Sequence, residues 1–124
     1  MSFVHHSNYL KYYEIGRLLW LKNIGYSYKK LELQKIILPV IETKIKFRKP
    51  AFFDDDLILE TTILKSPSYS IEFNYSISRN TELINEGYTK LIFLNSETKK
   101  PIRCPKNIIE KINIEISNNS KQLE

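Results

Sequence analysis

The chain has 124 residues, 42% of them hydrophobic and 12% aromatic, which is enough to bury the core of one domain but not of two. No stretch approaches the ~20 consecutive apolar residues that cross a bilayer, and the N-terminus lacks the pattern of a secretion signal. The single cysteine, Cys104, and two adjacent histidines provide neither an internal disulfide nor the spacing of a zinc site, which favours the reducing cytoplasm. The net charge of +5 favours an anionic partner without choosing among nucleic acid, an acidic membrane surface and a phosphorylated ligand.

A long helix is predicted from about Asn8 to Asn23. Ser7 is a good N-cap residue, no proline interrupts the segment, and Gly25 stands where helices often end in a left-handed residue. Apolar side chains occupy most of the circumference, so we expect the helix to be mostly buried. Gly16 in its middle costs about 1 kcal/mol relative to alanine, which indicates either a close approach by a backbone or ligand, or a tolerated glycine.

Strands are predicted after the helix. Pro39 marks a bulge or the start of the first strand, whose alternation predicts a half-buried face of Ile41, Thr43, Ile45 and Phe47. A turn of solvated aspartates at 54–56 precedes a second strand at about 57–64. The clearest two-residue period, at 69–77, predicts a third strand, and a hairpin turn at 79–82 leads to a fourth at about 83–94 with a bulge at Gly87.

The C-terminal part contains one more helical pattern. Pro105 opens a short helix, in which the apolar side chains that share one side are Ile108, Ile109, Ile112 and Ile116. The polar remainder, 117–124, is expected to be a loose tail. An apolar helix followed by antiparallel strands is best buried by a sheet that curls around it, so the fold class is α+β.

The start of the long helix is where chemistry is expected. A helix N-terminus presents unpaired N–H groups and the positive end of the helix dipole, which can hold negative charge developing on a carbonyl oxygen. The paired imidazoles of His5 and His6 lie directly before this helix, and a histidine there can donate a further hydrogen bond.

The segment from Val4 to Glu14, VHHSNYLKYYE, resembles the hotdog-fold acyl-CoA thioesterases of the 4-hydroxybenzoyl-CoA thioesterase type, especially the Tol–Pal-associated branch. Weaker similarities follow in the same order along the chain, at 21–25, 48–51, 86–87 and 98–105. The resemblance implies a hotdog fold, in which a curled antiparallel sheet wraps a long central helix. It implies one domain over 1–116, followed by the polar tail 117–124.

The resemblance also implies a function, the hydrolysis of an acyl thioester, usually acyl-CoA, at a site between two subunits of a homodimer or homotetramer. No metal or redox cofactor is implied. The backbone N–H and the side chain of His6 are expected to stabilise the oxyanion; the alternative is a histidine at the helix start satisfied by backbone. The residues expected to contact substrate are His5, Asn8, Tyr9, Arg48, Lys49 and Arg103. For His5 the favoured alternative is packing under the loop, and for Asn8 and Tyr9 it is capping and fixing the helix start.

One feature of the family pattern is missing. The family's aspartate, which acts as general base or nucleophile, would precede Met1 on a first strand that is also absent, and losing such a carboxylate commonly costs ~10²–10⁴ in rate. Either the reading frame begins upstream, or the chain is a shortened, catalytically silent hotdog domain that binds an acyl group or a partner protein. Glu14, two turns beyond His6, is the leading substitute; the alternative is an ion pair with Lys11 or Arg17.

Basic residues fit a CoA tail, whose phosphates are anionic, although solvated lysines are the default interpretation of such a pattern. They form two groups along the chain, 44–49 and 99–106. The alternating Tyr69, Phe73 and Tyr75 fit a core face better than a base-stacking sheet, so no nucleic-acid partner is expected.

Overall fold

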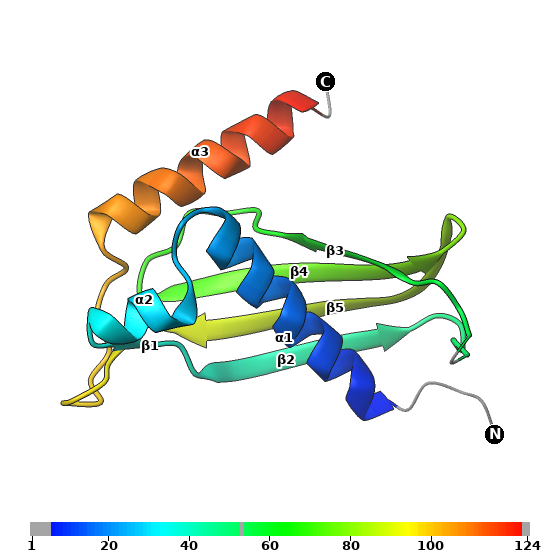
Figure 1. Cartoon of the computed structure of the whole chain (residues 1–124), viewed down its shortest axis with the longest axis horizontal. Helices are drawn as coiled ribbons and strands as arrows, with labels where there is room; N and C mark the ends of the chain where they lie inside the picture. The colour runs from blue at the N-terminus through cyan, green and yellow to red at the C-terminus, as the bar shows by residue number, and fades with distance from the viewer. Residues whose placement is uncertain (1–5, 53, 123–124) are drawn as a thin grey trace.

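The computed structural model describes residues 6–52 and 54–122, with the side chains of 8–52 and 54–119. A four-stranded antiparallel sheet in the order β2-β5-β4-β3 and a small sheet of β1 and β6 lie beside helices (Figure 1). The predicted α+β class is confirmed. The elements are α1 (His6–Asn23), α2 (Tyr28–Leu33), β1 (Ile36–Ile37), β2 (Val40–Phe47), β3 (Ile58–Thr62), β4 (Ser70–Arg79), β5 (Glu82–Ile92), β6 (Leu94–Asn95) and α3 (Lys106–Gln122).

Helix α1 crosses one face of the sheet diagonally, with its first turn near the end of β2 (Figure 1). The predicted two-residue period of β4 is confirmed, because its buried side chains alternate with half-buried ones. The predicted hairpin is also present, since Arg79 pairs with Glu82 and the two residues between them, Asn80 and Thr81, have positive φ. The inward side chains of β4 are Ile71, Phe73, Tyr75 and Ile77.

Gly87 does not form the predicted bulge. The pairing of β4 and β5 runs through Gly87 without interruption, and the extra residue is Ile84, between the partners of Ile77 and Ser78. A Cβ atom at Gly87 would lie 2.2 Å from Cε2 and 2.4 Å from Cζ of the Tyr13 ring. Glycine is therefore required here by an aromatic side chain of α1 and not by strand geometry.

Gly16 of α1 is approached closely, but by side chains and not by the predicted backbone or ligand. A Cβ atom there would lie 2.4 Å from Oγ1 of Thr61 and 2.9 Å from Cδ2 of Leu59. Strand β3 therefore packs directly against the helix backbone.

The prediction that α1 is mostly buried is wrong for the described chain. Its buried side chains lie on one side, whereas Leu10, Ile15 and Leu19 are 45%, 52% and 52% exposed. A single sheet can cover only one side of a helix, and α2 and α3 do not cover the rest.

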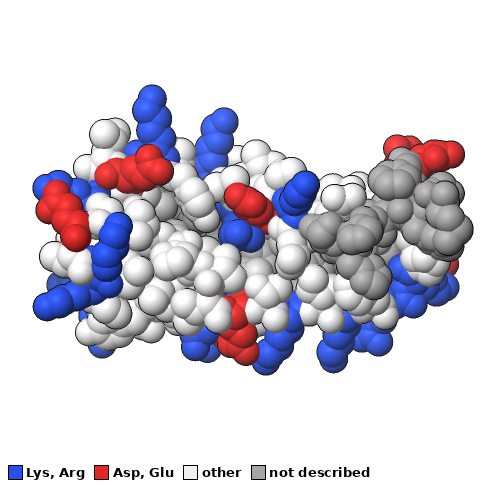
Figure 2. All heavy atoms as spheres, turned by 90° about the horizontal axis from the view of Figure 1, so that it is seen from below, with Lys and Arg blue, Asp and Glu red and all other residues white. Residues whose placement is uncertain are grey.

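The prediction of a half-buried face on β2 is also wrong, because β2 is the edge strand and α1 leaves most of it uncovered. Ile41 and Phe47 are exposed and Ile45 is half-buried. Pro39 does mark the start of this strand, and its register with β5 shifts between Val40 and Glu42. Figure 2 views the molecule from below, where uncharged atoms make up most of the middle and Lys and Arg project along the margins.

Helix α3 begins after Pro105 as predicted, and Ile108 and Ile112 are buried. It continues to Gln122, so the loose segment predicted from Ser117 is wrong for residues 117–122. These residues contain neither proline nor glycine, so nothing in them interrupts the helical hydrogen bonds.

We expect Gly87→Ala to lower the free energy of unfolding by about 1–3 kcal/mol, because the methyl group overlaps the Tyr13 ring and forces α1 to move. Urea denaturation followed by circular dichroism measures the change. Ser76→Ala, on β4 opposite Glu86, is the matched control and should change stability by less than about 0.5 kcal/mol. Equal stability of Gly87→Ala and the unsubstituted chain would contradict this role of glycine.

Candidate functional site

The site begins at the first turn of α1, which starts at His6. The first N–H groups of a helix have no partner within the helix, so they are available to an anion or a polarised carbonyl oxygen. His5 and the imidazole of His6 lie outside the described residues and side chains. Among the residues predicted beside them, Asn8 is half-buried and Tyr9 is only 2% exposed.

Tyr9 fixes the helix start to the end of β2 and the loop that follows. Its ring lies 5.7 Å from the ring of Phe47 and 6.0 Å from that of Tyr12, measured between centroids. Burial raises the pKa of the Tyr9 hydroxyl, and a hydrogen bond with the backbone of Ala51 opposes this rise. The position of Tyr9 therefore fits the predicted fixing of the helix start.

The same loop is held by Asp55. Its Oδ2 accepts hydrogen bonds from the backbone N–H of Phe52 at 2.8 Å and from Nη1 of Arg79 at 2.6 Å. Both hydrogen bonds lower the pKa of the Asp55 carboxyl, and the one from the Phe52 backbone has the larger effect. The turn at 54–56 is thus not simply solvated as predicted, because its central carboxylate is bonded to β4.

One turn further along α1, Tyr13 connects the helix to the middle of the sheet. Its hydroxyl donates to Oδ1 of Asn85 at 2.5 Å, and its ring stacks on Tyr75 at 4.3 Å. Burial raises the pKa of Tyr13 well above its ordinary value, so the hydroxyl stays a donor. Asn85 is fully buried, and its position as a polar residue on the inward face of β5 is the sequence signal that could have identified this contact.

Glu14 is exposed, and no ion pair joins it to another described side chain, so the alternative of a pair with Lys11 or Arg17 is not found. Arg17 is only 9% exposed, and its Nε has no partner among the described residues. Burial raises the pKa of Tyr75, and hydrogen bonds with Thr89 and Arg17 oppose the rise. Arg17 is thus directed to the sheet. Because no described side chain pairs with Glu14, its carboxylate is available to a ligand or a second chain.

The basic residues predicted to bind substrate lie at opposite ends of the sheet. Arg48 donates its backbone N–H to Ile84, whereas Ile102, next to Arg103, donates to Phe93. Nine residues of strand separate these two carbonyl groups, or about 30 Å. A single CoA tail therefore cannot place the same phosphate on both groups within one chain.

Each of these cations already has a partner. Arg48 pairs with Glu86 at 2.8 Å, Lys49 pairs with Glu82 at 3.0 Å, and the Arg103 guanidinium lies 5.2 Å from the centroid of the Tyr69 ring. These contacts are exposed at the surface, where ion pairs contribute little and can be replaced by a ligand.

Burial raises the pKa of the Cys104 thiol to about 12, so this thiol is not an ionised nucleophile at neutral pH. Among the described side chains, 8–52 and 54–119, no three of His, Cys, Asp or Glu are grouped to hold a metal ion. None of the helices in the described part of the chain is long and apolar enough to cross a membrane.

The family model for the thioesterase-like superfamily matches residues 1–112. The chain belongs to this superfamily. Its hotdog fold agrees with two solved structures. Hypothetical protein TT1821 from Thermus thermophilus has a TM-score of 0.84 and 29% identity, over 92% of this chain and 87% of that one. DHNA-CoA thioesterase from Staphylococcus aureus has a TM-score of 0.86 and 26% identity, over 100% of this chain and 85% of that one.

Curated relatives of this thioesterase-like chain have similar coverage. The putative acyl-CoA thioesterase YneP of Bacillus subtilis is 28% identical over 107 residues, which are 86% of this chain and 78% of that protein. The acyl-CoA thioester hydrolase YbgC of Escherichia coli O6:H1 is 28% identical over 108 residues, 86% and 80% of the two chains.

The Asp55–Arg79–Glu82 contacts predict how stability depends on pH. Folding lowers the pKa of the Asp55 carboxyl. It also lowers the pKa of the Glu82 carboxyl, because that group accepts a hydrogen bond from Lys49 and, with a smaller effect, one from Arg79. A carboxyl whose pKa is lowered by folding stabilises the fold while it is ionised, and this stabilisation is lost as the pH falls through the folded pKa, below about 4. The thermal unfolding midpoint should therefore fall more steeply between about pH 5 and pH 2 in the unsubstituted chain than in Arg79→Leu.

Differential scanning fluorimetry across this pH range measures the two slopes. Arg103→Leu removes a cation that lies on an aromatic ring, and this control should keep the original slope. Identical slopes for Arg79→Leu and the unsubstituted chain would contradict a contribution of Arg79 to the lowered pKa of the two carboxyls, beside those of Phe52 and Lys49.

Proposed function

We propose that the chain is a thioesterase that hydrolyses acyl-CoA or acyl-carrier thioesters at a subunit interface. The observation that carries the proposal is the superfamily match over residues 1–112, which includes a helix that begins at His6. Relatives named as acyl-CoA thioesterases support the substrate class.

In the proposed reaction, water attacks the thioester carbonyl and the oxygen becomes an oxyanion. The first N–H groups of α1 and the His6 side chain stabilise this oxyanion, and its collapse releases a free acid and the CoA thiol. Glu14 is the proposed general base, since its exposed carboxylate is not held by another described residue. Because it lies about 12 Å along α1 from His6, it acts on water at a carbonyl held by the α1 N-terminus of a second chain, and it then returns the proton to the leaving CoA thiolate. No metal or redox cofactor enters this scheme.

Several finer assignments belong to the same proposal. The 4-hydroxybenzoyl-CoA type and its Tol–Pal-associated branch are proposed from the motif at Val4 to Glu14. Arg48 and Lys49, near the start of α1, are proposed to bind the CoA phosphates. His5 and Asn8 are proposed to lie beside the acyl group. The proposed compartment is the cytoplasm. Because Arg103 lies at the other end of the sheet, it can contribute only to the site that a second chain completes.

The edge of β2 supports a second copy of the chain. Because Arg48 donates to Ile84 and antiparallel pairs alternate, Thr43 and Ile45 point their backbone N–H and C=O groups away from β5. A strand that exposes these groups beside apolar side chains is suited to pairing with another strand. A two-fold axis at this edge gives a homodimer, on which a homotetramer can be built.

We expect His6→Ala to lower kcat for acyl-CoA hydrolysis by about 10²–10³-fold with a smaller change in KM, because a transition-state donor is removed. A panel including short acyl-CoA esters and 4-hydroxybenzoyl-CoA, followed by thiol release, measures the change. His6→Gln keeps a donor and is the matched control, with circular dichroism verifying the helix. A full rate in His6→Ala would contradict the role of His6, and no release from any ester would favour the silent binding domain.

We expect Thr43→Pro to convert the oligomer into monomers, because it removes an outward N–H while leaving the β2–β5 hydrogen bonds in place. Size-exclusion chromatography with light scattering measures the mass. Thr43→Val keeps the N–H and should keep the mass of two or four chains. The same mass for Thr43→Pro and the unsubstituted protein would contradict pairing through β2.

A further inference from the structure

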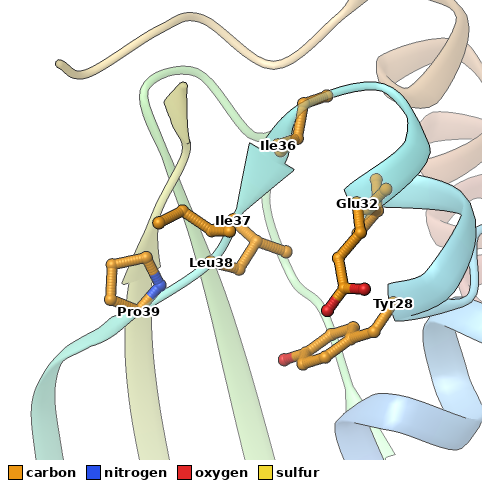
Figure 3. Close-up of a pocket in the computed structure, with 7 residues that line it drawn as sticks. Tyr28, Glu32, Ile36, Ile37, Leu38 and Pro39 are labelled. Atoms are coloured by element: carbon orange, nitrogen blue, oxygen red, sulfur yellow. The ribbon is translucent and has the colours of Figure 1, made fainter. Parts of the chain in front are cut away.

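An apolar pocket of about 260 Å³ lies at the end of the molecule where α2 turns into β1. Tyr28, Leu31 and Glu32 of α2 form one wall, and the segment 36–39 forms the other (Figure 3). Figure 3 shows the Glu32 carboxylate beside the Tyr28 ring, across from Ile37, Leu38 and Pro39. The pocket is lined mainly by aliphatic groups and carries one charged side chain at its rim.

The walls of this pocket are fixed by local structure. Ser27 caps α2 by accepting a hydrogen bond from the N–H of Lys30 at 3.2 Å, and Leu31 is buried in the core. Strand β1 is held by its pairing with β6, in which Ile37 lies opposite Leu94. The pocket is therefore formed before a ligand arrives, which is typical of small-molecule sites.

The pocket cannot serve the α1 N-terminus of its own chain. Helix α1 has 18 residues, so its first turn lies about 27 Å from its last, and the pocket lies beyond the last turn. The pocket does, however, border the start of β2 at Pro39, whereas the first turn of α1 lies at the other end of β2, where Tyr9 contacts Phe47.

Pairing of two β2 edges brings these two ends together. A two-fold axis normal to the sheet makes the two strands antiparallel and keeps both α1 helices on the same face. The start of β2 in one chain then lies near the end of β2 in its partner. The pocket of one chain accordingly faces the α1 N-terminus of the other.

We propose that this pocket binds the acyl group of a thioester whose carbonyl is held at the partner subunit's α1 N-terminus, and that Glu32 selects neutral acyl groups over those ending in a carboxylate. This inference rests on the proposed thioesterase function. A volume just below the usual range of about 300–1,000 Å³ for ligand pockets favours short and medium acyl groups. A carboxylate brought beside Glu32 meets a like charge at the pocket rim, which is unfavourable.

Hexanoyl-CoA and adipoyl-CoA test this selection, because their acyl groups have the same number of carbons and only the second ends in a carboxylate. We expect the unsubstituted protein to prefer hexanoyl-CoA in kcat/KM, and Glu32→Lys to shift the ratio towards adipoyl-CoA by at least about tenfold. Glu110→Lys changes the net charge equally on the exposed side of α3 and should leave the ratio unchanged.

A second variant tests the volume. Leu38→Trp should fill the pocket, so that kcat/KM for hexanoyl-CoA falls at least about tenfold while acetyl-CoA, which does not reach the pocket, is turned over as before. Retained acetyl-CoA turnover shows that this variant is folded.

Calorimetric binding of the two CoA esters separates the inference from the function on which it rests. If thioesters are hydrolysed but neither Glu32→Lys nor Leu38→Trp changes the substrate profile, the pocket is wrongly assigned and the thioesterase function stands. If hexanoyl-CoA is bound with the expected preference but never cleaved, the pocket stands and the proposed function fails. If neither ester is bound or cleaved but another acyl-CoA ester is hydrolysed, the pocket is wrongly assigned and the function stands; if no acyl-CoA ester is bound or cleaved, both are overturned.

Discussion

The contact of Tyr13 with Gly87 and Asn85 determines how the long helix lies on the sheet. The ring occupies the space that a side chain at Gly87 would need, and the hydroxyl binds a fully buried amide. Packing and a buried hydrogen bond therefore act at one point, where a shift of the helix would cost both. Stacking on Tyr75 extends the contact to the neighbouring strand.

Because α1 is fixed at its middle, its two ends have defined positions. The first turn lies at the end of β2, where Tyr9 meets Phe47 and the backbone of Ala51. The loop there is held in turn by Asp55 and Arg79. Donors that stabilise a transition state need such rigid support, since small displacements of an oxyanion donor lose much of its effect.

The same arrangement places β2 at the edge of the sheet. The helix leaves the edge strand largely uncovered, so exposed apolar side chains and outward backbone groups remain on that side. Under the proposed function, a second chain satisfies these groups and joins the α1 N-terminus of one subunit to the apolar pocket of the other. Stability and catalysis would then depend on the same interface.

Local pattern in the sequence determined α1, the period of β4, the β4–β5 hairpin and the start of α3, and the motif at Val4 to Glu14 indicated the thioesterase-like superfamily. Each of these depends on residues close together in the chain. The burial of β2, the reason for Gly87 and the Asp55–Arg79 contact were decided only by tertiary structure. They depend on which strand lies at the edge of the sheet and on which distant side chain fills a gap. The spacing of residues along the chain contains no information about either.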